Sequence, residues 1–231
     1  MVWRMILTVI YFLRNFGSYG SLFWLPTALG KAKKLSDLTL GNLVTIPYIL
    51  AAILMVVTAK SSDNTGERRA HMSLTYIVSG ASFLGALVTQ AFPLLSFSLI
   101  SVAVAAVYAS LGPFWALPTE TLPPKVVATA MGLINAIGNL GGYFGPVVVG
   151  HYLKQSGGFV YGFGSLGIAL VIAAGMSFIL RPAKPAVAAT VSSWDEANTK
   201  GTKETQEITR KLRDLVFSFL TSVFSVRISY V

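Results

Sequence analysis

Cysteine is absent from the 231 residues of this chain, and charged side chains are scarce. Without cysteine there is no disulfide, no thiolate metal site and no cysteine nucleophile. Only 12% of the residues are charged, about half of the usual share in globular proteins, whereas 54% are hydrophobic. A soluble domain of this size could not bury so much apolar surface. The composition therefore indicates a membrane protein.

Six long apolar stretches fill the first 180 residues, and each is long enough to cross a bilayer. An α-helix rises about 1.5 Å per residue, so about 20 residues span a hydrocarbon core about 30 Å thick. The stretches lack the alternation of apolar and polar residues that transmembrane barrel strands show. The sequence therefore predicts an all-α integral membrane protein, a six-helix bundle over residues 1–180 with spans at about 5–29, 40–59, 72–92, 94–117, 126–152 and 159–180.

The charges near the spans predict the side of the membrane that each loop occupies. Cytoplasmic segments are enriched in Lys and Arg. If the chain starts inside, the outer segments carry Lys31, Lys33, Lys34 and Lys154, and the inner segments carry more, namely Arg4, Lys60, Arg68, Arg69, Lys125, Arg181 and Lys184. We therefore expect a multi-pass protein of the cell (inner or plasma) membrane with both termini in the cytoplasm, although the lysines at 31–34 oppose this orientation. Topology and contact with lipid headgroups explain the net charge of +9 without a nucleic-acid partner.

The chain changes character after Leu180. Residues 181–205 are rich in Ala, Thr, Ser, Pro and Lys and hold few large apolar side chains, which predicts a disordered cytoplasmic linker. Beyond them, apolar residues recur at helical spacing among basic ones. Residues 206–231 are therefore either an amphipathic helix on the inner membrane surface or a non-native tail, such as the product of a shifted reading frame.

Arg14 lies near the middle of the first predicted span. An Arg at the centre of a span costs about 2.5–3.5 kcal/mol, so its side chain should face protein or water. Asn15 and Tyr19 lie beside it and form a polar, aromatic strip. Two interpretations stay open: the guanidinium binds the carboxylate of an anionic substrate, or it snorkels or pairs with a helix outside this chain.

The fourth and fifth predicted spans also carry polar and aromatic residues on one face. Tyr108 and Trp115 either wall a site for a small organic molecule or form an ordinary packing seam. Asn135 and Asn139 lie on one face of the fifth span and either bind a polar ligand or hydrogen-bond a neighbouring helix. Pairs of glycines four residues apart let helix backbones approach closely, and the fifth span has two such pairs, Gly138 with Gly142 and Gly141 with Gly145.

Nothing in the sequence favours an enzyme. No nucleophile–base pair or phosphate-binding loop stands out, and the two histidines are too far apart in sequence to suggest a metal site. We expect neither a metal nor a cofactor. No acidic residue lies in the interior of a span, so a transported proton would have no obvious acid to bind in this chain.

Several motifs, in matching order over residues 5–180, resemble the C-terminal six-helix half of anion:cation symporters in the major facilitator superfamily. The resemblance implies a carrier that imports a small organic anion by alternating access, usually driven by a proton gradient. Members of that family carry tartrate, glucarate, galactonate, phthalate, allantoate and nicotinate. The motifs are Tyr11-Phe12, Gly17–Gly20, Phe23–Pro26, Ser62–Arg69, Phe114–Pro118 and Asn135–Pro146.

The loop between the second and third spans departs from the family pattern. The family signature has Gly four residues before its Asp and Arg immediately after it, where this chain has Ala59 and Asn64. The gating role that the resemblance implies for this loop is therefore carried over only to Asp63, Gly66, Arg68 and Arg69.

Family members have twelve spans in two halves, and this chain resembles one half. Alternating access rocks two bundles about a site between them, so we expect a partner: a second six-helix half or another copy of the chain. Arg14, with Asn15 beside it, would hold the anion. The hypothesis places further substrate contacts at Tyr19, Tyr108, Trp115, Asn135 and Asn139. The alternative is a truncated, non-transporting fragment or a membrane scaffold.

Overall fold

The computed structural model describes residues 2–33, 36–122, 124–156, 158–180, 210, 211 and 214. The chain divides into two compact units, residues 1–185 and 186–231, and the fold below is that of the first. Regular structure in its described residues is entirely helical: α1 (Val2–Lys33), α2 (Asp37–Thr65), α3 (Arg68–Val88), α4 (Pro93–Ala109), α5 (Leu111–Thr121), α6 (Pro124–Gly138), α7 (Leu140–Ser156) and α8 (Val160–Ile179).

Five helical segments of the described chain are long and apolar enough to cross a membrane: Asp37–Thr65, Arg68–Val88, Pro93–Thr121, Val126–Ser156 and Val160–Ile179. Beside them lies α1, which is longer than any of these at 32 residues. Its middle carries Arg14 and Asn15, which make it less apolar than a simple span. The predicted all-α membrane fold is confirmed.

Two of the predicted spans are each interrupted by one non-helical residue. Between α4 and α5 the break falls at Ser110, three residues before Pro113, which has no N–H to donate to the carbonyl of Ala109. Between α6 and α7 it falls at Asn139, whose carbonyl accepts from the N–H of Gly142 at 2.9 Å, a tighter turn than an α-helix makes. The glycines on either side of Asn139 make bending easy there, but the sequence does not specify the position of the break.

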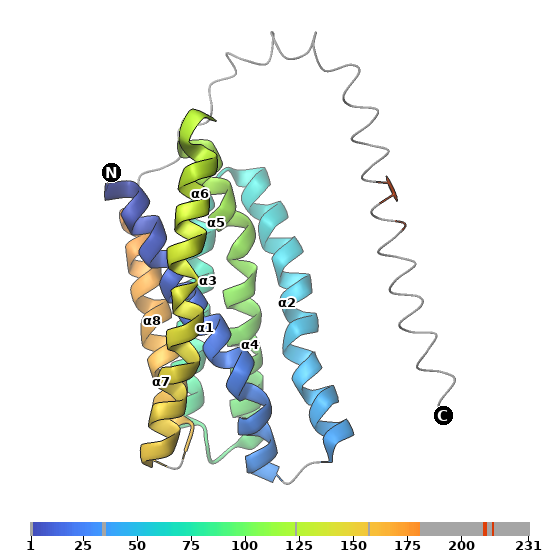
Figure 1. Ribbon diagram of the computed structural model, residues 1–231. Helices are drawn as coiled ribbons and strands as arrows, with labels where there is room; N and C mark the ends of the chain where they lie inside the picture. The colour runs from blue at the N-terminus through green and yellow to red at the C-terminus, as the bar shows by residue number, and fades with distance from the viewer. Residues whose placement is uncertain are drawn as a thin grey trace. The chain divides into compact units, whose positions relative to one another are not determined.

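The helices run side by side in one bundle, with α2 at its edge (Figure 1). The most extensive contacts join α3 to α8 and α4, α1 to α7 and α8, and α2 to α4. Large side chains fill the centre of the bundle and are fully buried, among them Tyr76, Phe83, Phe114, Leu166 and Leu170.

The outer surfaces are apolar, as lipid contact requires. In α2 only Pro47, Ala51 and Ser62 are buried. Aliphatic side chains cover the rest of that helix, and exposed residues on it include Ile46, Ile49, Ile53, Val56 and Val57. Large exposed side chains of this kind on α2, α6, α7 and α8 would be unfavourable in water, which fits a multi-pass membrane protein.

Glycine allows α7 to approach α1 at backbone distance. A Cβ added to Gly141 would lie 2.0 Å from the carbonyl oxygen of Phe12, and one added to Gly145 would lie 2.2 Å from that of Phe16. The other two glycines of the predicted packing pattern contact side chains instead, because added Cβ atoms would meet Tyr11 at Gly138 and Tyr19 at Gly142. All four glycines thus face α1.

The predicted linker at 181–205 lies outside the described residues. So does the predicted amphipathic helix or non-native tail at 206–231, apart from residues 210, 211 and 214.

Gly141→Ala and Gly145→Ala should each lower the free energy of unfolding by about 1–3 kcal/mol, because a methyl group at either position must push two backbones apart. Unfolding of the purified protein in mixed dodecyl maltoside and SDS micelles measures this. Gly175→Ala in α8 is the matched control, since an added Cβ there meets nothing within 4 Å. Equal SDS midpoints for all three variants would contradict the close α1–α7 contact.

Candidate functional site

Arg14 of α1 is buried inside the bundle, with 4% of its surface exposed. One of its terminal nitrogens, NH1, donates to the side-chain oxygen of Asn15 at 2.7 Å. Its Nε and its other terminal nitrogen, NH2, are buried and have no hydrogen-bond partner among the described residues. A buried charge with unused donors is costly, and an anion is the kind of group that could satisfy those donors.

Three asparagine side chains extend the polar contact of Arg14 from α1 to the α6–α7 break. Asn15 Nδ2 donates to Asn139 Oδ1 at 3.1 Å and to the carbonyl oxygen of Gly138 at 3.3 Å. Asn139 Nδ2 in turn donates to Asn135 Oδ1 at 3.0 Å. We call Asn15, Asn139 and Asn135 the amide relay. The break at Asn139 and the adjacent glycine therefore supply both the side chain and the carbonyl that Asn15 contacts.

Aromatic rings surround the guanidinium. Its central carbon lies 5.3 Å from the ring centre of Tyr108, a favourable cation–π distance, and Tyr48 packs edge-on against that ring. Three other tyrosines lie close enough to act electrostatically on Arg14: Tyr11, Tyr19 and Tyr76.

A recess of about 380 Å³ lies at the far end of the amide relay, lined by Tyr11, Trp115, Met131, Gly132 and Asn135. Tyr11 contacts the ring of Trp115 edge-on, with centroids 5.0 Å apart, so the two rings form one wall. Asn135 and Asn139 are exposed although they lie within the apolar segment Val126–Ser156, and Tyr19 of α1 is exposed as well. Polar groups facing hydrocarbon are costly, which indicates that this face meets water or protein.

The structure thus brings together most of the predicted substrate contacts. Arg14 and the amide relay form one connected chain, Tyr108 covers the guanidinium, and Trp115 lines the recess. The sequence indicates Tyr48 only as a weaker site candidate in the second span, and it does not indicate Tyr76. Both come from helices whose rotation about their axes the sequence does not specify.

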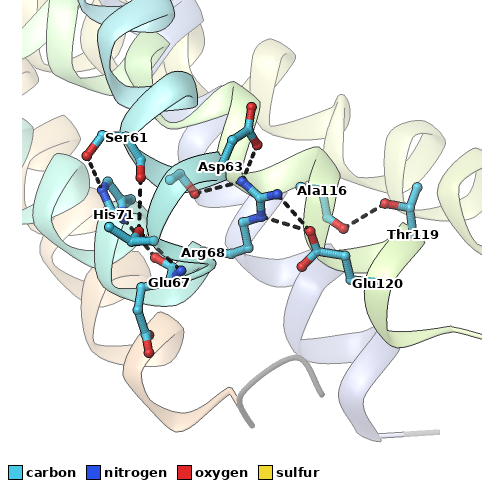
Figure 2. A network of polar contacts seen from close by, with 10 residues as sticks. Ser61, Asp63, Glu67, Arg68, His71, Ala116, Thr119 and Glu120 are labelled. Atoms are coloured by element: carbon cyan, nitrogen blue, oxygen red, sulfur yellow. Dashed lines mark hydrogen bonds and ion pairs between the residues drawn. The ribbon is translucent and has the colours of Figure 1, made fainter. Parts of the chain in front are cut away.

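A second polar cluster lies at the end of the bundle where α2 ends and α3 begins (Figure 2). Arg68 donates from Nε and NH2 to one carboxylate oxygen of Glu120 in α5, at 2.9 and 2.8 Å. It also pairs with Asp63 and donates to the hydroxyl of Ser62 at 3.1 Å. The sequence places Glu120 just beyond the predicted span at 94–117 but does not give its partner, because that pairing depends on how α5 packs.

The two other predicted gating residues also connect helix ends. Gly66 terminates α2 in the left-handed conformation, φ 69°, and donates its N–H to the carbonyl of Ser62 at 3.0 Å. Arg69 donates to the carbonyl of Leu180, just after α8. The cluster therefore fastens the ends of α2, α3, α5 and α8 to one another.

No group of three or more His, Cys, Asp or Glu side chains among the described residues is placed to hold a metal ion.

Comparison with known proteins gives consistent matches. The family model for the Major Facilitator Superfamily matches residues 7–231. A putative tartrate transporter of Agrobacterium vitis is 34% identical over 185 residues, which cover 78% of this chain and 41% of that protein. A quinolone resistance transporter of Acinetobacter baumannii is 30% identical over 179 residues, covering 77% of this chain and again 41% of the relative. The chain thus spans about two fifths of the length of these curated relatives.

A solved structure matches as well. The crystal structure of a D-xylose–proton symporter superposes with a TM-score of 0.59 at 14% identity, covering 91% of this chain and 53% of the other. At that identity the likeness concerns the fold alone.

Arg68 should couple more strongly to Glu120 than to Asp63. The Glu120 side chain is 29% exposed and takes two donors, whereas that of Asp63 is 65% exposed and screened by water. Double-mutant cycles built from alanine variants, read by unfolding in mixed micelles, should give about 1 kcal/mol for the pair with Glu120 and less than about 0.5 kcal/mol for the pair with Asp63. The reverse order would contradict this arrangement.

Proposed function

The chain belongs to the major facilitator superfamily, and on that premise we propose that it forms half of a secondary carrier that imports a small organic carboxylate together with protons. Arg14 carries the proposal. Its guanidinium is buried, lies in the middle of a long helix and keeps two donor nitrogens unused among the described residues.

A carboxylate suits Arg14 better than other anions that the site could meet. Nε and a terminal nitrogen of a guanidinium present parallel N–H groups that match the two oxygens of a carboxylate. The ring of Tyr108 occupies one approach to the guanidinium, with its centre 5.3 Å from the central carbon of that group. Two relatives named putative tartrate transporters, 30% and 34% identical, favour the same chemistry.

The exposed polar face around Asn135, Asn139 and Tyr19 favours a second bundle. In alternating access the substrate site lies between two bundles, and these residues would face that site. The partner would be a second six-helix half, from the same or a separate polypeptide, or another copy of this chain. The chain covers about two fifths of its curated relatives, which leaves room for such a half.

Proton coupling would depend on that partner. The acids of the described transmembrane helices lie at helix ends, as Asp37, Asp63 and Glu120 do, and none lies near the middle of a span. A proton-binding acid at the midplane would therefore come from the other half. The Arg68 cluster would lie on the cytoplasmic side of a cell membrane, as the distribution of Lys and Arg indicates, and would act as a gate latch.

Arg14→Ala should lower uptake of the transported acid by about thirtyfold or more, because breaking a buried charge pair costs at least about 2 kcal/mol. The variant is made at the chromosomal locus, so that any partner is present, and cells are tested with labelled tartrate, glucarate and benzoate. Arg14→Lys keeps the charge but not the paired donors, and it should retain part of the uptake.

The matched control is Arg4→Ala, which removes an exposed arginine from the same helix. It should transport like the wild type, with equal amounts of each variant in the membrane fraction. Uptake that is unchanged in Arg14→Ala would remove this residue from the substrate site and would overturn the proposed function.

A further inference from the structure

We infer that Arg14 fixes the hydrogen-bond direction of the amide relay, so that Asn135 offers a donor to the recess and selects acids whose second end is an acceptor. Such acids carry a carboxylate or keto oxygen at the far end rather than an ammonium group. This inference rests on the proposed function and adds a specificity rule to it.

Arg14 sets the hydrogen-bond direction at the first member of the amide relay. An arginine can only donate, so the side-chain atom of Asn15 that meets its NH1 at 2.7 Å must be the oxygen. The amide nitrogen of Asn15 then points toward α6 and α7, where the carbonyl oxygen of Gly138 accepts from it at 3.3 Å. A backbone carbonyl can only accept. NH1 of Arg14 and the carbonyl of Gly138 therefore require the same orientation of the Asn15 amide. If that amide were flipped, its nitrogen would face the donor of Arg14 and its oxygen would face the carbonyl oxygen of Gly138.

The orientation passes along the relay from one amide to the next. Asn15 Nδ2 also meets Asn139, so the atom it meets must be an oxygen, Oδ1, at 3.1 Å. Asn139 Nδ2 is then turned to Asn135 Oδ1 at 3.0 Å. Asn135 consequently uses its oxygen within the relay and keeps its amide nitrogen, a double donor, for other partners. Among the described residues nothing accepts a hydrogen bond from that nitrogen.

The recess shows what this donor can meet. Asn135 lines it together with the rings of Tyr11 and Trp115, and the side chain of Asn135 is exposed. The other two members of the lining, Met131 and Gly132, are uncharged, so no acid is present there to bind an ammonium group. The recess therefore offers an N–H donor between aromatic walls. An acceptor atom of a ligand can take a hydrogen bond from that donor, whereas a ligand's ammonium group, itself a donor, cannot.

A substrate would then be recognised at two points. Its first carboxylate would take the free donors of Arg14, and an oxygen at its second end would take Asn135 Nδ2. Hydrogen-bonded amides also polarise one another, so the positive charge at one end of the relay strengthens the donor at the other. Diacids and keto acids can accept hydrogen bonds at both points. An amino acid instead places its ammonium group against the amide donor of Asn135.

Two matched sets of acids test the rule, because their members differ only at the second end. The four-carbon set is succinate, butyrate and 4-aminobutyrate, and the six-carbon set is adipate, hexanoate and 6-aminohexanoate. Uptake is measured at neutral pH in cells with chromosomal variants, after subtraction of the uptake of a deletion strain. The wild type should prefer the diacid over the amino acid by roughly tenfold in at least one set.

Asn135→Asp reverses the chemistry at the recess, because an ionised carboxylate accepts from Asn139 and has no N–H to offer. Diacid uptake should fall by roughly tenfold or more, and amino acid uptake should rise relative to it. Asn135→Leu removes the donor without adding an acceptor, so it should abolish the preference for diacid over monoacid. Asn42→Asp is the matched control, since it adds the same charge at an exposed position of α2. It should keep the wild-type order of preference among the diacid, the monoacid and the amino acid.

The outcomes separate the two claims. The specificity rule is overturned if Asn135→Asp and Asn135→Leu keep the wild-type order of preference among the acids. It is also overturned if the wild type takes up none of these acids or prefers the amino acids. The proposed function would still stand in that case, provided that Arg14→Ala loses uptake of the acids tested above. If Arg14→Ala keeps that uptake, the proposed function itself fails.

Discussion

Hydrocarbon offers no hydrogen bonds, and this constraint governs every polar group within the long helices of the chain. Arg14 is the most demanding of these groups, because its charge lies inside the bundle and cannot be neutralised by losing a proton. The protein meets part of this demand with Asn15 and with the ring of Tyr108. The unmet part, two buried donor nitrogens, is the feature on which the proposed binding of an anion depends.

The packing of α7 against α1 also makes possible the polar contacts that extend from Arg14. Gly141 and Gly145 let α7 lie against the backbone of α1, and only at such a separation can the short side chain of Asn15 reach both Asn139 and the carbonyl of Gly138. Asn139 forms the break between α6 and α7, and its side chain contacts Asn15 of α1. The small residues that let the helices pack closely therefore also determine where the polar side chains can meet.

Much of this could be predicted from the sequence, for physical reasons that also show where prediction stops. Apolar length identified the helices, and an arginine in a span indicated a site because so large a cost requires a compensating partner. The spacing of Asn135 and Asn139 placed both on one face. The sequence could not show that Asn15 joins them to Arg14, since that depends on the rotation of α1. Nor could it pair Arg68 with Glu120, 52 residues away, because that contact forms only when α5 packs beside α3.

The central claim is that the exposed polar face formed by Asn135, Asn139 and Tyr19 meets water or substrate, whereas the apolar residues beside it meet lipid. Because the chain has no native cysteine, single substitutions report this directly: Asn135→Cys on the polar face and Leu133→Cys two residues away, where the native side chain is also exposed. A charged thiol reagent reacts with thiolate, which needs water. In native membranes we expect rapid labelling of Asn135→Cys that a transported acid slows, and no labelling of Leu133→Cys. Labelling of Leu133→Cys with an inert Asn135→Cys would contradict the account.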